Sequence, residues 1–436
     1  MGEDNQLGFE FPGLGRRKIE ANFAGGEVSS DGGVMLLRQV DRWLGLTKQL
    51  DRILPDRRNP LMIQHSQESL LRQRIYGIAL GYEDLNDHDS LRHDLLWQTA
   101  IDRDQELGSC ATLCRLENRA GRREAWLMHQ VLLEQFVGSF VEPPKELILD
   151  FDCTDDRVHG QQVGRAFHGY YYDYCFLPLY VFCGEQLLVS YLRPSNIDPA
   201  KHAWAILAKL VGALRKQWPE VKITLRADSG FCRWKMLRWC ETHQVDYIVG
   251  IAKNERLKTL SAKLQQRAER KHRKGGQKVR LFRQFKYKAE SWDRKRRIIA
   301  KAEHTVQGAN PRFVVTNLSG SAQSLYDQLY CARGEMENRI KEQQLGLFSD
   351  RTSCHYWWPN QFRLLLSSCA YVLVEALRRL GLKATELARA QVSTIRLKLL
   401  KIGAVITRNS RRVRIWFSSA FPFKELFKLC LDCFYG

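Results

Sequence analysis

Carboxylates interrupt an apolar segment, "ELILDFDCTDDR" at Glu146 to Arg157, in a pattern that could bind a metal ion. In an extended strand, side chains two positions apart share a face, so Asp150 and Asp152 project together while Phe151 points to the other side. Two like charges in a partly dry site raise each other's pKa, and a divalent cation between them relieves the repulsion. The pattern predicts a hard-cation site, and strand geometry leaves open whether Asp150 or Asp152 carries the metal.

Two further acidic residues, Asp228 and Glu337, lie in segments where a metal ligand could be placed. Asp228 ends the apolar segment "VKITLRAD", at the carboxyl end of a predicted strand, where sites in α/β proteins usually form. Farther along, four residues spaced three, four and four apart line one face of a predicted helix: Tyr330, Arg333, Glu337 and Lys341. Taken singly, this helix reads as an ion-pair ladder of small energetic value. Taken with the two aspartates, Glu337 completes a distributed constellation of acids that favours a metal site.

A set of carboxylates of this kind suits Mg²⁺, with Mn²⁺ as a substitute, because hard cations prefer oxygen ligands. Two such ions can activate an attacking oxygen and stabilise the leaving oxygen at phosphorus. Phosphodiester cleavage and DNA strand transfer are therefore the candidate reactions.

Three short motifs make a family resemblance specific: "DCT" at 152–154, "RAD" at 226–228 and "YCARGEME" at 330–337. They resemble the signatures of DDE transposases whose third acid lies on a Tyr-Arg-Glu helix. Other segments resemble the thirteen-eighty family of bacterial insertion-sequence transposases over nearly the whole chain, among them "SSDGGVMLL", "GYEDLNDHDSLRHD" and "NQFRLLLSSCAYVL".

The resemblance implies a catalytic triad of Asp152, Asp228 and Glu337. We expect the same three residues to bind the metal, as two Mg²⁺ ions. The phenol, guanidinium and ammonium groups beside Glu337 suit phosphate, so we expect Tyr330, Arg333 and Lys341 to bind DNA phosphates. Relatives carry a lysine seven residues after the catalytic Glu, where this chain has Gln344. Some relatives stack a displaced base on an aromatic residue before the helix, a role open here to Phe313 or to Trp292, with core packing as the alternative for Phe313.

The pattern of strands and helices predicts an α/β fold with a mixed sheet, a β-rich insertion and an all-helical N-terminal domain. The family resemblance implies that the mixed sheet is an RNase H-like catalytic core. The prolines of "VEPPKE" set the first boundary. The predicted segments are a helical DNA-binding domain at 1–140, the first part of the core at 141–256, a basic insertion at 257–311, the rest of the core with following helices at 312–400, and a basic β-ribbon with tail at 401–436.

The charge of the chain points to a polyanionic partner. Lys and Arg number 68 against 48 Asp and Glu, a formal net charge of +20. Fifteen of the basic residues lie between Arg267 and Lys301, interleaved with aromatic residues. This pattern suits a nucleic-acid surface, although a solvated basic protein that binds nothing has a similar composition.

The remaining features restrict the location. The 12 cysteines lie mostly within apolar runs, which favours reduced core thiols over disulfides, and "CLDC" at Cys430 to Cys433 lacks the partners of a zinc site. The sequence shows neither a secretion signal nor 18 uncharged apolar residues in a row. We expect a cytoplasmic, nucleoid-associated protein without a membrane segment.

The resemblance implies a DNA transposase that binds terminal inverted repeats and moves its element by cut-and-paste. Its partners would be double-stranded DNA of the element ends and of the target, with a homodimer joining two ends. Two alternatives stay open: an RNase H-like nuclease without strand transfer, and a domesticated DNA-binding protein without catalysis.

Overall fold

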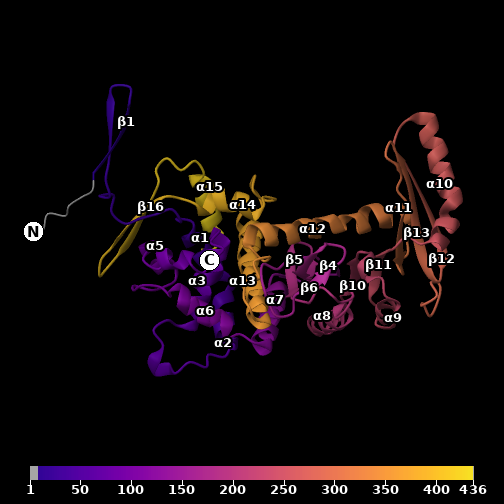
Figure 1. Cartoon of the computed structure of the whole chain (residues 1–436), viewed down its shortest axis with the longest axis horizontal. Helices are drawn as coiled ribbons and strands as arrows, with labels where there is room; N and C mark the ends of the chain where they lie inside the picture. The colour runs from indigo at the N-terminus through magenta and orange to yellow at the C-terminus, as the bar shows by residue number, and fades with distance from the viewer. Residues whose placement is uncertain (1–7, 436) are drawn as a thin grey trace, which may run out of the picture. The chain divides into compact units, whose positions relative to one another are not determined.

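The computed structural model describes residues 8–435, and they divide into two compact units (Figure 1). The first unit comprises the residues up to Ala120, 346–348 and those from Cys369 onward. The second unit comprises Gly121–Leu345 and Ser349–Ser368. The long helix α7 (Arg122–Gly138) falls in the second unit, where it packs on strand β9 (Gln186–Tyr191). The unit boundary therefore precedes α7, whereas the sequence suggested a division near residue 140.

The second unit is built on a mixed sheet of nine strands, which confirms the predicted mixed α/β class. Its main path has the order β12-β13-β15-β11-β10-β4-β8-β9, with β14 (Gly308–Ala309) paired to β13. The strands of this path are β4 (Glu146–Cys153), β8 (Leu179–Cys183), β9, β10 (Lys222–Ala227), β11 (Asp246–Ile251), β12 (Val279–Tyr287), β13 (Arg296–Thr305) and β15 (Arg312–Thr316). Strands β4, β10 and β11 are parallel, and the other neighbours are antiparallel.

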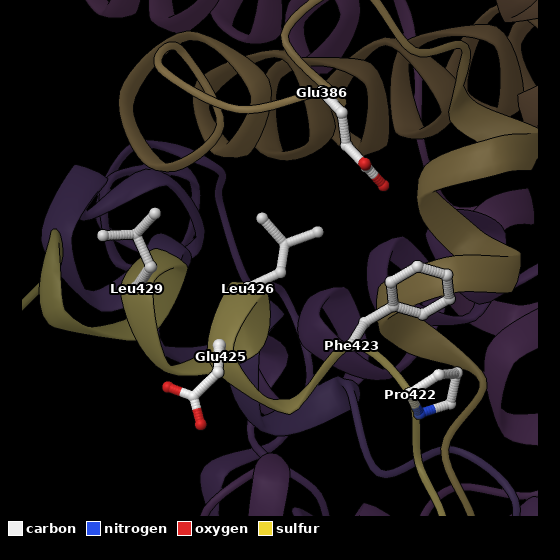
Figure 2. Close-up of a pocket in the computed structure, with 6 residues that line it drawn as sticks. All are labelled: Glu386, Pro422, Phe423, Glu425, Leu426 and Leu429. Atoms are coloured by element: carbon white, nitrogen blue, oxygen red, sulfur yellow. The ribbon is translucent and has the colours of Figure 1, made fainter.

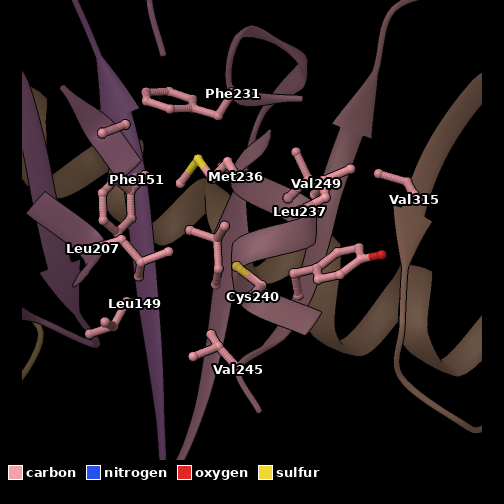
Figure 3. Packing of buried hydrophobic residues seen from close by; sticks show 14 of the residues in the cluster. Leu149, Phe151, Leu207, Phe231, Met236, Leu237, Cys240, Val245, Val249 and Val315 are labelled. Atoms are coloured by element: carbon pink, nitrogen blue, oxygen red, sulfur yellow. The ribbon is translucent and has the colours of Figure 1, made fainter. Parts of the chain in front are cut away.

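Helices α8 (Ala203–Gln217) and α9 (Trp234–Thr242) bury one face of this sheet. Figure 3 shows Leu149 and Phe151 of β4 packed among Leu207 of α8 and Leu237 of α9. Because side chains alternate along a strand, burial of Leu149 and Phe151 on this face sends the intervening carboxylates to the opposite one. The apolar spacing of β4 thus fixes the direction in which its acids point.

The predicted basic insertion consists of a charged helix followed by a hairpin, and this hairpin joins the central sheet. Helix α10 (Glu255–Gly275) begins after Asn254, whose side chain accepts a hydrogen bond from the N–H of Leu257, and lies along β12 and β13 (Figure 1). Strand β13 pairs with β15, which pairs with β11. The hairpin therefore extends the central sheet, because the buried face of β13 continues the hydrophobic core.

The helix that carries Glu337 departs repeatedly from α geometry. It passes through α11 (Ala322–Ser324), the π-helical η3 (Leu325–Tyr330), the 3₁₀ turn η4 (Cys331–Arg333), α12 (Gly334–Lys341) and the π-helical η5 (Glu342–Gly346). Ser321 caps its start by accepting a hydrogen bond from the N–H of Ser324. Changes of helix type often occur at functional sites, because they re-aim the side chains that follow.

The first unit is mainly helical, but the prediction of an all-helical N-terminal domain is wrong. An exposed hairpin is formed by β1 (Phe9–Leu14) and β2 (Arg17–Ala21), and β3 (Val28–Ser29) pairs with β16 (Ala404–Arg408) of the predicted C-terminal ribbon, completed by β17 (Val413–Phe417). Its helices and turns are α1 (Val34–Leu44), α2 (Leu46–Ile53), η1 (Pro60–Met62), α3 (Gln67–Leu80), α4 (Asp87–Leu91), α5 (Leu95–Ala100), α6 (Cys110–Asn118), η6 (Leu377–Gly381), α14 (Val392–Ile395), η7 (Arg396–Leu400) and α15 (Lys424–Asp432). Helix α13 (Trp357–Ala376) has residues in both units.

All 12 cysteines carry free thiols. Within residues 8–435, each helix is too short or too polar to cross a lipid bilayer.

Candidate active site

Asp152 and Asp228 lie at the ends of two neighbouring strands, at the same edge of the sheet. Strands β4 and β10 are parallel neighbours, and Phe151 pairs with Ala227 in register, so the next residue on each strand is one of the two aspartates. Asp228 also caps the 3₁₀ turn η2 (Ser229–Phe231), where its Oδ1 accepts a hydrogen bond from the N–H of Gly230 at 2.8 Å. The parallel pairing therefore brings two acids that are far apart in sequence to one carboxyl-terminal edge.

Glu337 is joined to Asp152 by an arginine from its own helix. The Arg333 guanidinium donates from Nη1 to Oδ2 of Asp152 at 2.8 Å and from Nη2 to Oε1 of Glu337. Arg333 and Glu337 are four residues apart, so the helix presents both on one side. One guanidinium thus bridges the end of β4 and the helix, and the structure brings together three of the residues predicted from sequence.

The carboxyl group of Asp152 is buried and lies near two other carboxylates. Burial raises the pKa of its carboxyl group to about 7; Arg333 opposes this shift, and the charges of Asp228 and Glu337 add to it. The guanidinium of Arg333 is itself held strongly protonated by Asp152 and Glu337, which raise its pKa against the effect of burial. A further cation near these carboxylates would therefore be stabilised.

This raised pKa predicts how stability depends on pH. Folded Asp152 keeps its proton up to about pH 7, whereas the unfolded chain loses it near about pH 4. The stabilisation from this group is thus complete below about pH 4 and is lost as the pH rises to about 7. Relative to Asp152→Asn, the free energy of unfolding of the wild type should fall over this interval by at most about 1.4 kcal/mol per pH unit. Urea unfolding in EDTA at several pH values measures this difference, and a constant difference would contradict the assignment.

Tyr330 lies over Gly250, a residue that the sequence alone did not mark as functional. A Cβ atom at Gly250 of β11 would meet the Tyr330 hydroxyl at 2.6 Å and the backbone nitrogen of Ser229 at 2.9 Å. Burial raises the pKa of Tyr330; Arg333 opposes the shift and Asp228 adds to it. Any side chain at position 250 would therefore displace either the phenol or the turn that follows Asp228, so Gly250 is part of the site.

Asp150 forms its ion pair with a different arginine from the one that binds Asp152. It is only 1% exposed, and its carboxylate accepts hydrogen bonds from Nε and Nη2 of Arg226, the residue paired with it on β10. The remaining Nη1 of Arg226 donates to the backbone carbonyl of Leu329 at 2.6 Å. Asp150 is thus the counter-ion of Arg226, and this pair ties both strands to the helix just before Tyr330.

Other predicted residues lie farther from the acids. Lys341 is exposed one turn beyond Glu337. Gln344, at the position where relatives carry lysine, donates from Nε2 to the backbone carbonyl of Asp155 at 3.0 Å. The helix is therefore tied to the loop after Asp152 by a neutral amide.

The base-stacking role suggested for Phe313 and Trp292 does not fit the structure. Phe313 is 3% exposed and Trp292 5% exposed, and both pack in the hydrophobic core of the second unit. Trp292 contacts Tyr287 edge-to-face, with ring centroids 5.7 Å apart. Because neither ring offers an open face, a nucleobase could not stack on them without unpacking the core.

The carboxylates of Asp152, Asp228 and Glu337 suit a hard divalent cation in donor type and in charge. The distances between them suit such a cation less well. The three carboxylates are the oxygen donors that Mg²⁺ prefers. Yet within residues 8–435 no three His, Cys, Asp or Glu side chains converge closely enough to hold one ion. Arg333 is the positive charge that bridges Asp152 and Glu337 in this arrangement. Glu337 could join a shared ion only after that guanidinium moves.

A pocket in the first unit has a different character. It has a volume of about 670 Å³ and is lined by the six residues shown in Figure 2: Glu386, Pro422, Phe423, Glu425, Leu426 and Leu429. Its lining combines apolar side chains with two carboxylates, one of which, Glu386, is paired with Lys398 at 3.5 Å.

Comparison with known proteins gave a match to a family model and a similarity to a solved structure. The family model described as "Transposase DDE domain group 1" matches residues 11–434. The search of curated proteins found no match. Among solved structures, the chain is similar to piggyBac transposase in a cryo-EM structure of its synaptic complex with hairpin DNA. The identity is 10%, the alignment covers 85% of this chain and 79% of that chain, and the TM-score is 0.40.

Proposed function

The chain belongs to group 1 of the DDE transposase domain family, and on this premise we propose that it cuts and joins DNA strands with Asp152, Asp228 and Glu337 as its catalytic carboxylates. The observation that carries this proposal is the Arg333 bridge, which unites Asp152 and Glu337 beside Asp228 at one edge of the sheet. In finer detail, the protein would be a bacterial insertion-sequence transposase of the thirteen-eighty type that moves its element by cut-and-paste.

The strand order supports an RNase H-like core for this enzyme. Strands β4, β8 and β9 form an antiparallel meander, and β10 and β11 extend the sheet on the other side of β4, parallel to it. The first acid ends the first strand of this set, the second acid follows the fourth strand, and the third lies on a later helix. This is the arrangement expected of a DDE catalytic core.

Mg²⁺, or Mn²⁺ in its place, would be held by Asp152 and Asp228, with Glu337 joining when Arg333 releases it. When bound, a pair of such ions supplies an activated oxygen nucleophile and stabilisation of the leaving oxygen. Asp152 must first give up the proton that its pKa of about 7 lets it keep. Arg333, once released, carries a guanidinium fork that matches a DNA phosphate, and Tyr330 would donate its phenol to the same strand.

Basic residues on the surface of the second unit would bind the DNA that extends beyond the three catalytic carboxylates. Helix α10 exposes a run of cations in its last turns, among them Arg270, Lys271 and Arg273, and β12 exposes Arg283 and Lys286. Such residues bind phosphates without reading sequence. We propose double-stranded DNA of the element ends and of the target as the partners, with a homodimer that brings two ends together.

Incubation with DNA that carries the terminal repeats of the element tests this function. In Mg²⁺ or Mn²⁺, labelled ends should be cut at the repeat boundary and their 3′ ends joined to a target plasmid, which gel electrophoresis resolves as two products. Cutting without joining would indicate a nuclease. Binding without metal-dependent cutting would leave a non-catalytic DNA-binding protein and refute the proposal.

A further inference from the structure

A short hairpin next to the catalytic edge exposes an unusual density of aromatic rings. Strands β5 (Asp156–Arg157), β7 (Asp173–Phe176) and β6 (Ala166–His168) form a three-stranded sheet in that order. The turn between β6 and β7 reads "HGYYYD". We call the rings at and around this turn the aromatic tip: Phe167, Tyr170, Tyr171, Tyr172 and Tyr174.

The rings of the aromatic tip face solvent although they contact one another. Tyr170 is 86% exposed and Tyr172 84% exposed. Phe167 contacts Tyr172 and Tyr174 edge-to-face, with centroids 5.6 Å and 5.7 Å apart. Tyr170 contacts Tyr171 in the same way at 5.0 Å. An edge-to-face contact covers a face of only one of its two rings. Because Tyr170 and Tyr172 keep most of their surface in solvent, ring faces stay open to a planar ligand.

The backbone at the aromatic tip is strained to present one of these rings. Tyr172 has φ +58°, and its N–H donates to the carbonyl of His168 at 2.8 Å to close the turn. A left-handed position favours glycine or asparagine, because a Cβ atom is disfavoured there. Tyr172 contacts Phe167 but leaves 84% of its surface in solvent, so packing offsets little of this strain. A strained residue with so little packing points to a functional role for its side chain.

The base of the hairpin is firmly anchored within the second unit. Asp156 is buried and accepts a hydrogen bond from Oγ1 of Thr352 at 2.8 Å. The N–H of Val163 donates to the carbonyl of His355 at 2.9 Å, and a Cβ atom at Gly164 would meet the ring of Trp357 at 2.5 Å. The hairpin therefore holds its exposed rings on a rigid support.

The aromatic tip also lies close to the catalytic acids. Strand β5 starts only four residues after Asp152. Tyr171 is half-buried, and after the effect of burial the charges of Cys153, Asp155 and Asp152 raise the pKa of its hydroxyl further. A DNA strand that crosses Asp152 would therefore pass within reach of these rings.

Two arginines give the aromatic tip the charge that a nucleotide needs. The Arg165 guanidinium lies over the ring of Tyr174, 4.9 Å from its centroid. Arg157 is largely exposed and only loosely paired with Asp155 and Asp173, at 3.9 Å and 3.8 Å. Open aromatic faces bind nucleobases by stacking, and neighbouring guanidinium groups bind the phosphates between them.

We propose that the aromatic tip, chiefly Tyr170 and Tyr172, is a stacking platform for unpaired bases of the DNA strand held at Asp152 and Asp228. The inference rests on the proposed function, because unpaired bases arise where a duplex is opened for cutting at its end. It adds a site for single-stranded nucleotides to the carboxylates that would perform the chemistry. The platform would hold the opened strand while its phosphodiester is attacked.

A binding assay without catalysis tests the platform. The probe is a DNA duplex with a short single-stranded extension that contains 2-aminopurine, mixed with the full-length protein in EDTA. The test variant combines Tyr170→Ala with Tyr172→Gly, since glycine accepts the left-handed backbone and preserves the turn. The wild type should quench the 2-aminopurine fluorescence, and the variant should lose this quenching and bind the extended probe roughly tenfold more weakly, with unchanged affinity for blunt duplex.

Two matched variants make the result specific. Tyr170→Phe combined with Tyr172→Phe keeps both rings and should retain the quenching. Trp126→Ala removes another exposed aromatic residue, on α7, and should leave both affinities unchanged. Equal quenching by the wild type and by the ring-deleted variant would overturn the proposal. The proposal would also be overturned if the ring-deleted variant differed from the wild type only in its sedimentation behaviour. The aromatic tip would then be a contact between copies of the chain.

These outcomes are separate from those of the cutting assay. If the wild type cuts and joins DNA while the ring-deleted variant still quenches, the platform is refuted and the proposed function stands. If the wild type never cuts DNA but quenches through Tyr170 and Tyr172, the proposed function fails and the base contact stands.

Discussion

Replacing any one of Asp152, Asp228 and Glu337 with its amide is expected to lower the rate of DNA cutting on the order of a thousandfold or more. The amide keeps the size of the side chain but removes the negative charge that would hold a divalent cation. Affinity for duplex DNA should not fall, because each change removes an acid from a surface that binds phosphates. Single-turnover cutting of labelled element ends measures the rate, and filter binding measures the affinity.

Glu335→Gln is the matched control for this experiment. Glu335 is exposed on α12, two residues before Glu337, and has no bond to Arg333 or to the strands that carry the aspartates. Its amide variant should cut DNA at the wild-type rate. Residual cutting by Asp152→Asn within tenfold of the wild type would remove Asp152 from the catalytic set, and the same criterion applies to Asp228 and Glu337.

Arg226→Met is expected to lower the free energy of unfolding by about 3–5 kcal/mol. The substitution leaves the carboxylate of Asp150 buried without its partner, and it leaves the carbonyl of Leu329 without its donor. Breaking one side of a buried ion pair costs more than the pair contributes, because the remaining charge is stranded in a dry environment. Urea unfolding monitored by tryptophan fluorescence measures the loss.

The double variant Asp150→Leu with Arg226→Met separates the two sources of this loss. With both charges removed, most of the stability should return, because an apolar pair suits the buried position. DNA cutting should not return to the same extent, since Leu329 stays untethered and the helix that carries Tyr330, Arg333 and Glu337 loses its link to β10. A double variant as active as the wild type would show that Arg226 has no part in positioning that helix. A single variant as stable as the wild type would show that the pair is not buried as described.

Several features of the second unit were predictable because they depend on neighbouring residues alone. The alternation in "LILDFDC" predicts a strand with Asp150 and Asp152 on one face, and β4 has this form. The spacing of Arg333 and Glu337 predicts that they share one face of a helix, and their side chains form an ion pair there. The mixed sheet follows from strands that alternate with helices, and it is confirmed. The roles of these residues in catalysis stay predictions until the cutting assay is done.

Other features depended on partners that lie far away in the sequence. Whether β12 and β13 form a separate sheet was decided by the pairing of β13 with β15, which local alternation does not encode. The N-terminal strand β3 exists because β16, from the far end of the chain, pairs with it. Phe313 and Trp292 are as aromatic as Tyr170, and only packing determines which of these rings are covered.

The sequence by itself determined which faces of its strands and helices carry acids, because side-chain direction follows from the backbone period. Only the tertiary structure decided what those acids meet. Asp150 and Asp152 share a strand and a face, yet Arg226 neutralises the first, while the second stays near Asp228 and Arg333 at the open end of the sheet. The reason is that charge compensation depends on distances between chain segments, and these are fixed by strand pairing rather than by the local sequence.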